Sequence, residues 1–372
     1  MFHCPGCGAR HAWGLRAHQC PTCAGPLDFA LEEVAFPREA ILSGPPGMWR
    51  YAEALPRFEQ PVSLGETFTP LVPCSIGETE VWCKVETTLP TGSYKDRGSA
   101  LLMSYLKELG VEEAVEDSSG NAGASLAAYA ARAGVRLKVF CPGSASSGKL
   151  LQIRLYGAEL VQVEGPRPRA TEALLAYEAR TKTPYASHLW HPFFLEGVKT
   201  LAFEMVEQLE WQAPGTVLCP VGAGSILLGL HKGFSELRRA GVIPRLPRLV
   251  AVQARNVSPL HRAFHQGEED VARAPDPQPT LAEGIALPMP VRGKALLRAL
   301  RESGGTVVAV SEEEIAAGVR HFGRAGFCVE PTSAVVWAGV ARLDRETGWD
   351  GPAVAVLSGH GLKASQAIIS LL

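Results

Sequence analysis

The sequence predicts an α/β protein with two lobes, each a twisted and mainly parallel sheet flanked by helices, and a small cysteine-rich appendage. Three observations predict this class. Short apolar or β-branched runs alternate with amphipathic helical patterns, as in parallel sheets covered on both faces. The length of 372 residues exceeds what one compact core usually holds. Two Cys-x-x-Cys pairs stand at the N-terminus, ahead of the first of these runs.

The expected elements follow one another in the order that such sheets require. The expected strands are residues 81–85, 137–141, 159–163, 216–219, 249–253, 306–310 and 353–357. The expected helices are residues 99–109, 123–133, 148–156, 169–180, 197–209, 226–240 and 312–325. Pro and Gly interrupt residues 36–70, so we expect irregular structure between the appendage and the first strand.

Composition and charge exclude several classes of function. The formal net charge of -2 does not indicate a basic surface that would bind nucleic acid. No apolar run reaches the roughly 18 residues that a membrane span needs, and no export signal is visible at the N-terminus. The nine cysteines suit a reducing compartment. We therefore expect a cytoplasmic protein with no nucleic-acid or membrane partner.

The N-terminal cysteines have the spacing of a metal site. Cys4 and Cys7 form one Cys-x-x-Cys turn, and Cys20 and Cys23 form a second after a spacer of twelve residues. Two such turns can point four thiolates at one ion, which favours structural zinc because no coordination position stays open. The alternatives are two unrelated cysteine pairs or redox-active dithiols.

The first candidate catalytic motif is a turn that leads into the helix expected at residues 99–109. Its sequence is Pro-Thr-Gly-Ser-Tyr-Lys-Asp-Arg-Gly, residues 90–98. Ser93 is a good N-cap, which places Lys95 in the first helical turn. The helix dipole there disfavours a charged ammonium and favours a neutral amine or an imine. The motif indicates a lysine that forms an imine, although an exposed lysine without a role would look the same.

A second motif combines small residues with a helix start. Ser118, Ser119 and Gly120 precede Asn121 and the helix expected at residues 123–133. The N–H groups of such a turn suit a carboxylate, and the Asn121 amide can hydrogen-bond a phenolate oxygen. An ordinary strand-to-helix turn would look similar.

Two further motifs follow expected strands. Gly222, Ala223, Gly224 and Ser225 form a glycine-rich turn of the kind that cradles phosphate, without the lysine of a P-loop or a full dinucleotide fingerprint. Ser358 follows the strand at residues 353–357, where its hydroxyl can hydrogen-bond a ring nitrogen without protonating it.

Together and in this order, the motifs resemble the fold-type II pyridoxal-phosphate enzymes, the tryptophan synthase β-like superfamily. The resemblance covers residues 69–372 and is strongest to threonine synthases. It rests on the lysine run and on the Ser-Gly-Asn-Ala-Gly, Leu-Glu-Gly-Val-Lys-Thr, Glu-Pro-Thr-Ser-Ala and Ser-Gly-His-Gly segments. An N-terminal zinc ribbon also occurs in many threonine synthase-like proteins.

The resemblance implies a role for each matching residue. Lys95 is the imine lysine and general base, and Asn121 meets the 3-hydroxyl of pyridoxal 5'-phosphate. Ser358 meets the ring nitrogen, while the cofactor phosphate lies on the turn formed by Gly222, Ala223, Gly224 and Ser225. The implied domains are a zinc ribbon at 1–30, a large lobe at 31–94 and 188–372, and a small mobile lobe at 95–187. A homodimer acting on a small amino acid is also implied.

The sequence departs from threonine synthases at the expected phosphate site of the substrate. Several of them place an arginine directly before the Leu-Glu-Gly run, where this chain has Phe194. Lys149 and Arg154 are alternative anion-binding candidates, or they lie on a solvated helix face. The aromatic residues at 190–194 favour a less anionic substrate.

Three functions stay open on the sequence alone. The first is threonine synthase activity, which converts O-phospho-L-homoserine and water to L-threonine and phosphate. The second is β-elimination or β-replacement on serine, threonine or O-phosphoserine, as in an ammonia-lyase. The third is a non-catalytic scaffold that carries a zinc ribbon, which the intact Lys95, Asn121 and Ser358 argue against.

Overall fold

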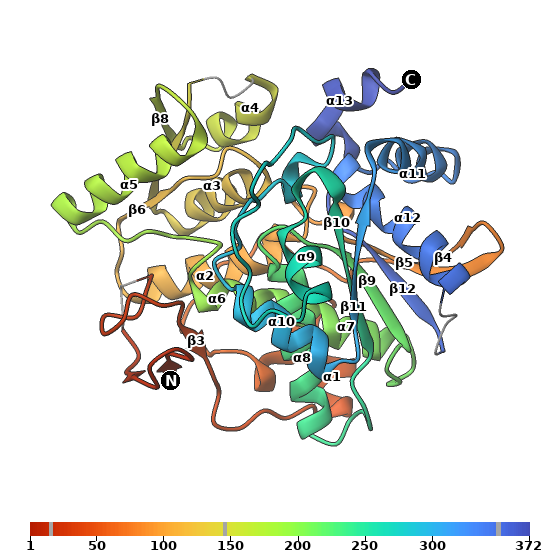
Figure 1. The fold of residues 1–372 in the computed structure, drawn as a ribbon. Helices are drawn as coiled ribbons and strands as arrows, with labels where there is room; N and C mark the ends of the chain where they lie inside the picture. The colour runs from red at the N-terminus through yellow and green to blue at the C-terminus, as the bar shows by residue number, and fades with distance from the viewer. Residues whose placement is uncertain (15–17, 144–146, 347–350) are drawn as a thin grey trace. The chain divides into compact units, whose positions relative to one another are not determined.

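The computed structural model describes residues 1–14, 18–143, 147–346 and 351–372, and its ribbon is drawn in Figure 1. The chain forms two compact units, here called unit 1 and unit 2. Unit 1 comprises Met1–Glu66 and Lys95–Val198, and unit 2 comprises Thr67–Tyr94 and Lys199–Leu372. Both units contain sheets and helices, so the predicted α/β class is confirmed. Residues 31–66 and 188–198 belong to the unit of Lys95, whereas the sequence had assigned them to the large lobe.

Unit 1 is built on a parallel three-stranded sheet of order β6-β7-β8 (Figure 1). Its strands are β6 (Glu113–Glu116), β7 (Arg136–Pro142) and β8 (Glu159–Val163). The helices that follow them in the chain are α3 (Asn121–Ala133), α4 (Ser147–Leu155) and α5 (Arg167–Thr181). Because each helix follows a parallel strand, the N-termini of all three helices lie at the carboxyl edge of the sheet.

Helix α5 is held against this sheet by a small apolar core. Ala170 and Leu174 of α5 pack with Val115, Phe140 and Tyr185. Tyr185 also continues the sheet, because it forms a parallel bridge with Val115. The chain therefore returns to the β6 side of the sheet after α5.

Helix α2 (Lys95–Glu108) packs closely on α6 (Pro192–Val198). A Cβ atom at Gly197 would lie 1.8 Å from the carbonyl oxygen of Arg97. A Cβ atom at Gly98 would lie 2.6 Å from ring carbons of Phe194. The two glycines let the helix backbones approach closely, and Phe194 fills the space beside Gly98.

The N-terminal segment packs on the same helices through aromatic rings. It contains the short strands β1 (Phe2–His3), β2 (Arg10–His11) and β3 (Asp28–Phe29), followed by α1 (Arg38–Ser43) and the 3₁₀ helix η1 (Met48–Ala54). The ring of Phe2 lies 5.7 Å from that of Tyr105 on α2, and Tyr105 stacks on Phe193 at 4.2 Å. Phe29 lies 4.7 Å from Phe193. The cysteine-bearing segment thus covers the outer side of α2.

Unit 2 contains a six-stranded sheet of order β11-β10-β9-β12-β5-β4, parallel except for the edge strand β4. The strands are β4 (Leu71–Ile76), β5 (Thr79–Val85), β9 (Thr216–Pro220), β10 (Arg248–Ala254), β11 (Thr306–Val310) and β12 (Ala353–Leu357). The helices are α7 (Thr200–Gln208), α8 (Ser225–Arg239), α9 (Pro259–His265), α10 (Gly293–Glu302), α11 (Glu312–Arg324), α12 (Pro331–Glu346) and α13 (Ser365–Ile369). Short 3₁₀ turns are η2 (Glu86–Thr88), η3 (Arg255–Val257), η4 (Glu283–Ile285) and η5 (Gly361–Ala364).

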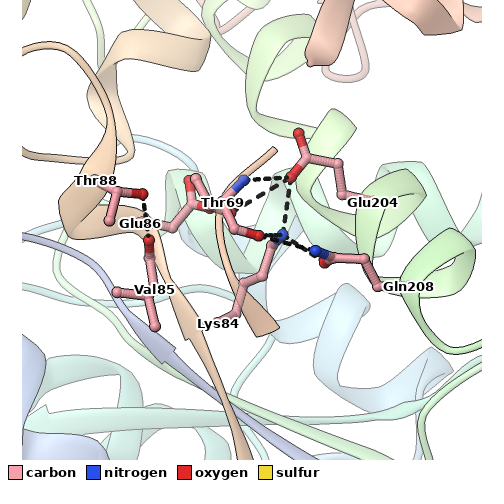
Figure 2. Close-up of polar contacts among 7 residues, drawn as sticks. All are labelled: Thr69, Lys84, Val85, Glu86, Thr88, Glu204 and Gln208. Atoms are coloured by element: carbon pink, nitrogen blue, oxygen red, sulfur yellow. Dashed lines mark hydrogen bonds and ion pairs between the residues drawn. The ribbon is translucent and has the colours of Figure 1, made fainter. Parts of the chain in front are cut away.

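A buried ion pair joins the end of β5 to α7, as Figure 2 shows. The Lys84 ammonium donates to Glu204 at 2.8 Å, to the Gln208 side chain at 2.7 Å and to the Thr69 carbonyl at 2.8 Å. Three acceptors satisfy the three N–H donors, which a fully buried lysine requires. The Thr69 hydroxyl donates to Glu86 at 2.6 Å, so the residues that follow β5 are held as well.

Most of the expected elements are confirmed. The strands at 159–163, 306–310 and 353–357 have the predicted bounds, and the other expected strands and helices differ by a few residues at their ends. The helix predicted at 197–209 is wrong in one respect, because the structure has α6 and α7 with a break at Lys199. Among the described residues, no helix combines the length and apolar character needed to cross a membrane.

The close approach of α2 and α6 gives a stability prediction. Gly197→Ala places a methyl group 1.8 Å from the Arg97 carbonyl oxygen, so one helix must move. Ordinary overpacking lowers the free energy of unfolding by about 1–3 kcal/mol. We expect a larger loss for Gly197→Ala, measured by urea denaturation. The control is Gly323→Ala on α11, where a Cβ atom meets nothing within 4 Å. The control should gain about 0.5–1 kcal/mol. Equal midpoints for the two variants would contradict the packing argument.

Candidate active site

In unit 2, three neighbouring parallel strands bring predicted site residues to one edge of the sheet. Strands β9, β12 and β5 lie side by side, and their carboxyl ends meet at the same edge. The glycine-rich turn follows β9, Ser358 follows β12, and the lysine-bearing run follows β5 and η2. Ligands of open α/β sheets bind at this edge.

Tyr94 connects these three segments. Its backbone N–H donates to the Ser358 carbonyl oxygen at 3.0 Å. Its phenol oxygen lies 2.9 Å from the Ser225 hydroxyl, within hydrogen-bond distance. Lys95 is the next residue in the chain and the first residue of α2. Tyr94, which ends this segment of unit 2, is therefore held in place directly before Lys95.

The turn at Gly222–Ser225 has the backbone of an anion cradle. A Cβ atom at Gly222 would lie 2.7 Å from the Cα of Ile285, so only glycine fits there. Gly224 has a φ of +84°, which strongly favours glycine, and it caps the fifteen-residue helix α8 that begins at Ser225. The first N–H groups of a helix have no intrahelical partners and attract phosphate. The turn fits the phosphate of the expected cofactor.

The Ser358 side chain is held by a second serine that the sequence analysis did not identify. The Ser333 and Ser358 hydroxyl oxygens lie 3.0 Å apart, and both residues are buried. The Gly359 N–H donates to the Ser333 hydroxyl at 2.8 Å. Ser333 lies in the Glu-Pro-Thr-Ser-Ala segment, a signal that the sequence analysis used only for the resemblance. These bonds restrict the direction of the Ser358 hydroxyl.

In unit 1, Lys95 and Asn121 each begin a helix. Lys95 starts α2, and Asn121 starts α3 after Gly120. Ser125 of α3 donates to the Asp96 carboxylate at 2.6 Å, which joins the second turn of α3 to the first turn of α2. A Cβ atom at Gly123 would lie 1.8 Å from the Ser118 carbonyl oxygen, so the loop before α3 folds onto the helix. The predicted first-turn position of Lys95 is confirmed.

A buried glutamate–histidine pair lies at the end of β6, and the sequence analysis missed it. Glu116 Oε1 and His188 Nδ1 are 2.7 Å apart. Burial first, and then the Asp117 charge, raise the pKa of Glu116 well above its usual value. Burial first, and then the charges of Lys95 and Arg167, lower the pKa of His188 well below its usual value. Both shifts favour the neutral forms of a pair that lies within electrostatic reach of Lys95.

The predicted substrate-binding residues have different surroundings. Ser118 is buried, Ser119 is partly buried and Gly120 is exposed, with the Gly120 N–H donating to the Ser118 hydroxyl at 3.3 Å. Arg154 is exposed in the last turn of α4. The Lys149 side chain lies outside the described residues. The roles of these five residues stay predictions.

Phe193 and Phe194 lie in the interior of unit 1. Both are fully buried, Phe193 among the aromatic rings of the N-terminal segment and Phe194 beside Gly98. Because these two side chains belong to the core of unit 1, they do not support the interpretation that the stretch at 190–194 reports a less anionic substrate.

The four N-terminal cysteines converge on one point. The Sγ atoms of Cys4, Cys7, Cys20 and Cys23 all lie within 4.8 Å of one another. Cys4 and Cys23 are separated by 3.4 Å, and Cys7 and Cys20 by 3.7 Å. Tetrahedral zinc with Zn–S bonds of about 2.3 Å needs sulfurs about 3.8 Å apart. The arrangement fits such an ion.

Comparisons with known proteins agree with this geometry. A model of the family described as pyridoxal-phosphate dependent enzyme matches residues 62–359. Threonine synthase of Methanocaldococcus jannaschii is 39% identical, with 87% of this chain and 82% of that protein covered. Threonine synthase of Methanosarcina acetivorans is 33% identical, with 100% of this chain and 94% of that protein covered. The crystal structure of a threonine deaminase from T.th. has a TM-score of 0.66 and 26% identity, covering 78% of this chain and 92% of that one.

The contacts of Ser333 give a prediction about cofactor binding. Ser333→Ala removes the group that orients Ser358 and leaves the Gly359 N–H without its acceptor. We expect the dissociation constant for pyridoxal phosphate to rise about fivefold to tenfold, as for a lost hydrogen bond of about 1 kcal/mol. The measurement is a titration of apoprotein followed by visible absorbance.

Two further variants make this test specific. Ser333→Thr keeps the hydroxyl and should restore the affinity. Ser303→Ala removes another buried serine, whose hydroxyl donates to the Leu300 carbonyl on α10, and should leave it unchanged. Equal affinities for the Ser333→Ala variant and the unmodified protein would show that Ser333 does not act through Ser358.

Proposed function

This chain belongs to the pyridoxal-phosphate dependent enzyme family, and we propose that it is a threonine synthase acting on O-phospho-L-homoserine. The single observation that carries the proposal is the pair of curated threonine synthases at 39% and 33% identity, of which the chain covers 82% and 94%. These relatives support the prediction that the protein is a carbon–oxygen lyase. The reaction joins O-phospho-L-homoserine and water and yields L-threonine and phosphate.

Each predicted residue has a definite task in this proposal. Bound pyridoxal phosphate supplies an electron sink for the carbanion at the substrate Cα. The Lys95 amine takes the proton from Cα and relays protons at Cα and Cβ. Asn121 orients the 3-hydroxyl of the cofactor, and the Ser358 hydroxyl forms a hydrogen bond with the ring nitrogen of the cofactor. The Gly222–Ser225 turn binds its phosphate.

The substrate carboxylate is assigned to the loop before α3. Ser118 and Ser119 offer hydroxyls, and Gly120 leads into the N-terminus of α3. The first N–H groups of this thirteen-residue helix favour an anion. Lys149 and Arg154 stay predicted contributors to the anion site.

The rival reactions are less well supported. Elimination of ammonia from serine or threonine, and β-replacement on a serine derivative, use the same lysine and cofactor residues. On the sequence alone, the aromatic stretch near Phe194 favoured them, but Phe193 and Phe194 are fully buried in the core. The non-catalytic scaffold is not supported either, because the family match spans the residues from before Lys95 to beyond Ser358.

We also propose that Cys4, Cys7, Cys20 and Cys23 bind a structural zinc ion. The four converging sulfur atoms support this proposal, since four thiolates complete a tetrahedral site and leave no position for substrate. A reducing cytoplasm would preserve the thiolates, which supports the predicted location. The homodimer stays a prediction that rests on the resemblance.

Turnover assays test the proposed reaction. The purified protein should release phosphate and threonine from O-phospho-L-homoserine, measured together in one assay. Lys95→Ala should abolish this turnover and the visible absorbance of the lysine-bound cofactor, because the amine that acts as general base and forms the imine is removed. Lys107→Ala, in the last turn of the same helix, is the matched control and should keep both. Release of 2-oxobutanoate from threonine, with no reaction of the phosphorylated substrate, would make the protein an ammonia-lyase.

Metal analysis tests the zinc site. Replacing Cys4 and Cys7 with Ser should remove the bound zinc and lower the thermal stability, because β1 and β3 then lose the crosslink near Phe2 and Phe29. Turnover should be largely preserved. Cys328→Ser changes an exposed cysteine of unit 2 and should keep the full zinc content. Complete loss of activity in a stably folded double variant would contradict a purely structural role.

A further inference from the structure

Unit 1 leaves the substrate phosphate of the proposed reaction without its expected partner. Position 194, where an arginine was expected, holds a fully buried Phe beside Gly98. A phosphate dianion requires a cation or several hydrogen-bond donors. A cation on another element near the loop that carries Ser118 and Ser119 can take the place of this arginine.

Helix α5 is tied to that loop. The Thr171 hydroxyl of α5 donates to Asp117 Oδ2 at 2.6 Å, and the Tyr185 hydroxyl donates to Asp117 Oδ1 at 2.7 Å. Asp117 directly precedes Ser118 in the chain. The N-terminal half of α5 therefore lies beside the residues predicted to bind the substrate carboxylate.

Arg167 lies on the face of α5 that contacts this loop. It is the first residue of the helix, and Thr171 follows at the i+4 position on the same face. Ala170 and Leu174 of that face are buried against the sheet, while Arg167 is exposed beyond them. Side chains on a helix point toward the N-terminus of that helix. The N-terminus of α5 lies at the carboxyl edge of the sheet, so the Arg167 side chain extends beyond the helix at this edge.

Arg167 differs from its neighbour Arg169 in its surroundings. Among the residues that the structure describes, its guanidinium makes no hydrogen bond or ion pair, whereas Arg169 pairs with Glu172 at 3.2 Å. The Arg167 and Lys95 charges both act on the buried Glu116 and His188. Burial favours the neutral form of Glu116, so this carboxyl does not cancel the positive charge beside it.

We propose that Arg167 binds the phosphate group of the substrate and takes the place of the arginine that position 194 lacks. This inference rests on the proposed function. The planar guanidinium can bind two phosphate oxygens through two parallel N–H groups, a fixed geometry that a lysine lacks. The substrate would then be held at its carboxylate by the loop before α3 and at its phosphate by the start of α5.

The test compares Arg167→Ala with Arg169→Ala in the cofactor-loaded protein. Three quantities are measured: turnover of O-phospho-L-homoserine, calorimetric binding of inorganic phosphate, and binding of phosphate-free L-threonine by visible absorbance. Arg167→Ala should raise the KM for the substrate and the Kd for inorganic phosphate about 10- to 100-fold, as for a lost charged hydrogen bond. Its Kd for threonine should stay within about twofold, since threonine carries no phosphate.

The companion variants separate a phosphate contact from a general effect. Arg167→Lys keeps the charge without the bidentate geometry and should bind phosphate with intermediate affinity. Arg169→Ala should match the unmodified protein in all three measurements. Unchanged phosphate binding in Arg167→Ala, or an equal loss of threonine affinity, would overturn the inference.

The two proposals can fail separately. If the unmodified protein turns over O-phospho-L-homoserine and Arg167→Ala does so equally well, the function stands and the inference falls. If the unmodified protein does not react with this substrate but binds inorganic phosphate through Arg167, the function falls and the anion site stands.

Discussion

The hydrogen bonds of Tyr94 are the constraint on which the candidate site depends. The residue belongs to unit 2, and its backbone and phenol groups bond to Ser358 and Ser225, the predicted partners of the cofactor ring and phosphate. Lys95 follows it directly and begins α2. A catalytic lysine on a flexible side chain is useful only if its Cα is fixed. Tyr94 provides this fixed point, and the Lys84–Glu204 ion pair holds the preceding strand.

The first turns of three helices concentrate positive potential at one edge of unit 1. Lys95 begins α2, Asn121 begins α3 and Arg167 begins α5. Helix N-termini add partial positive charge to these side chains. The buried Glu116–His188 pair lies among them, and burial favours its neutral form. Such an environment suits an anionic substrate.

Local sequence signals were sufficient for the elements and motifs but not for side-chain partnerships. Parallel strands of a sheet that is covered on both faces are largely buried, so β11 and β12 stand out as apolar runs with clear ends. Glu116 and His188 are 72 residues apart and carry no shared local signal, which is why the pair was missed. Ser333 orients Ser358 from 25 residues away. Residues 31–66 belong to unit 1 because of long-range contacts such as the Tyr129–Glu66 hydrogen bond.

The N-terminal segment offers a physical reason for the unusual residue at position 194. Phe2 and Phe29 pack on Tyr105 and Phe193, so this side of α2 and α6 is an apolar core rather than a solvent-facing surface. Phe194 continues that core on the other side of Phe193, against Gly98. A guanidinium in the same place would be buried, and burying an unpaired charge costs far more than the about 2–7 kcal/mol of a neutral polar group. With these helices covered by the segment, a helix with an exposed end can supply the cation for a phosphate group, and α5 has one.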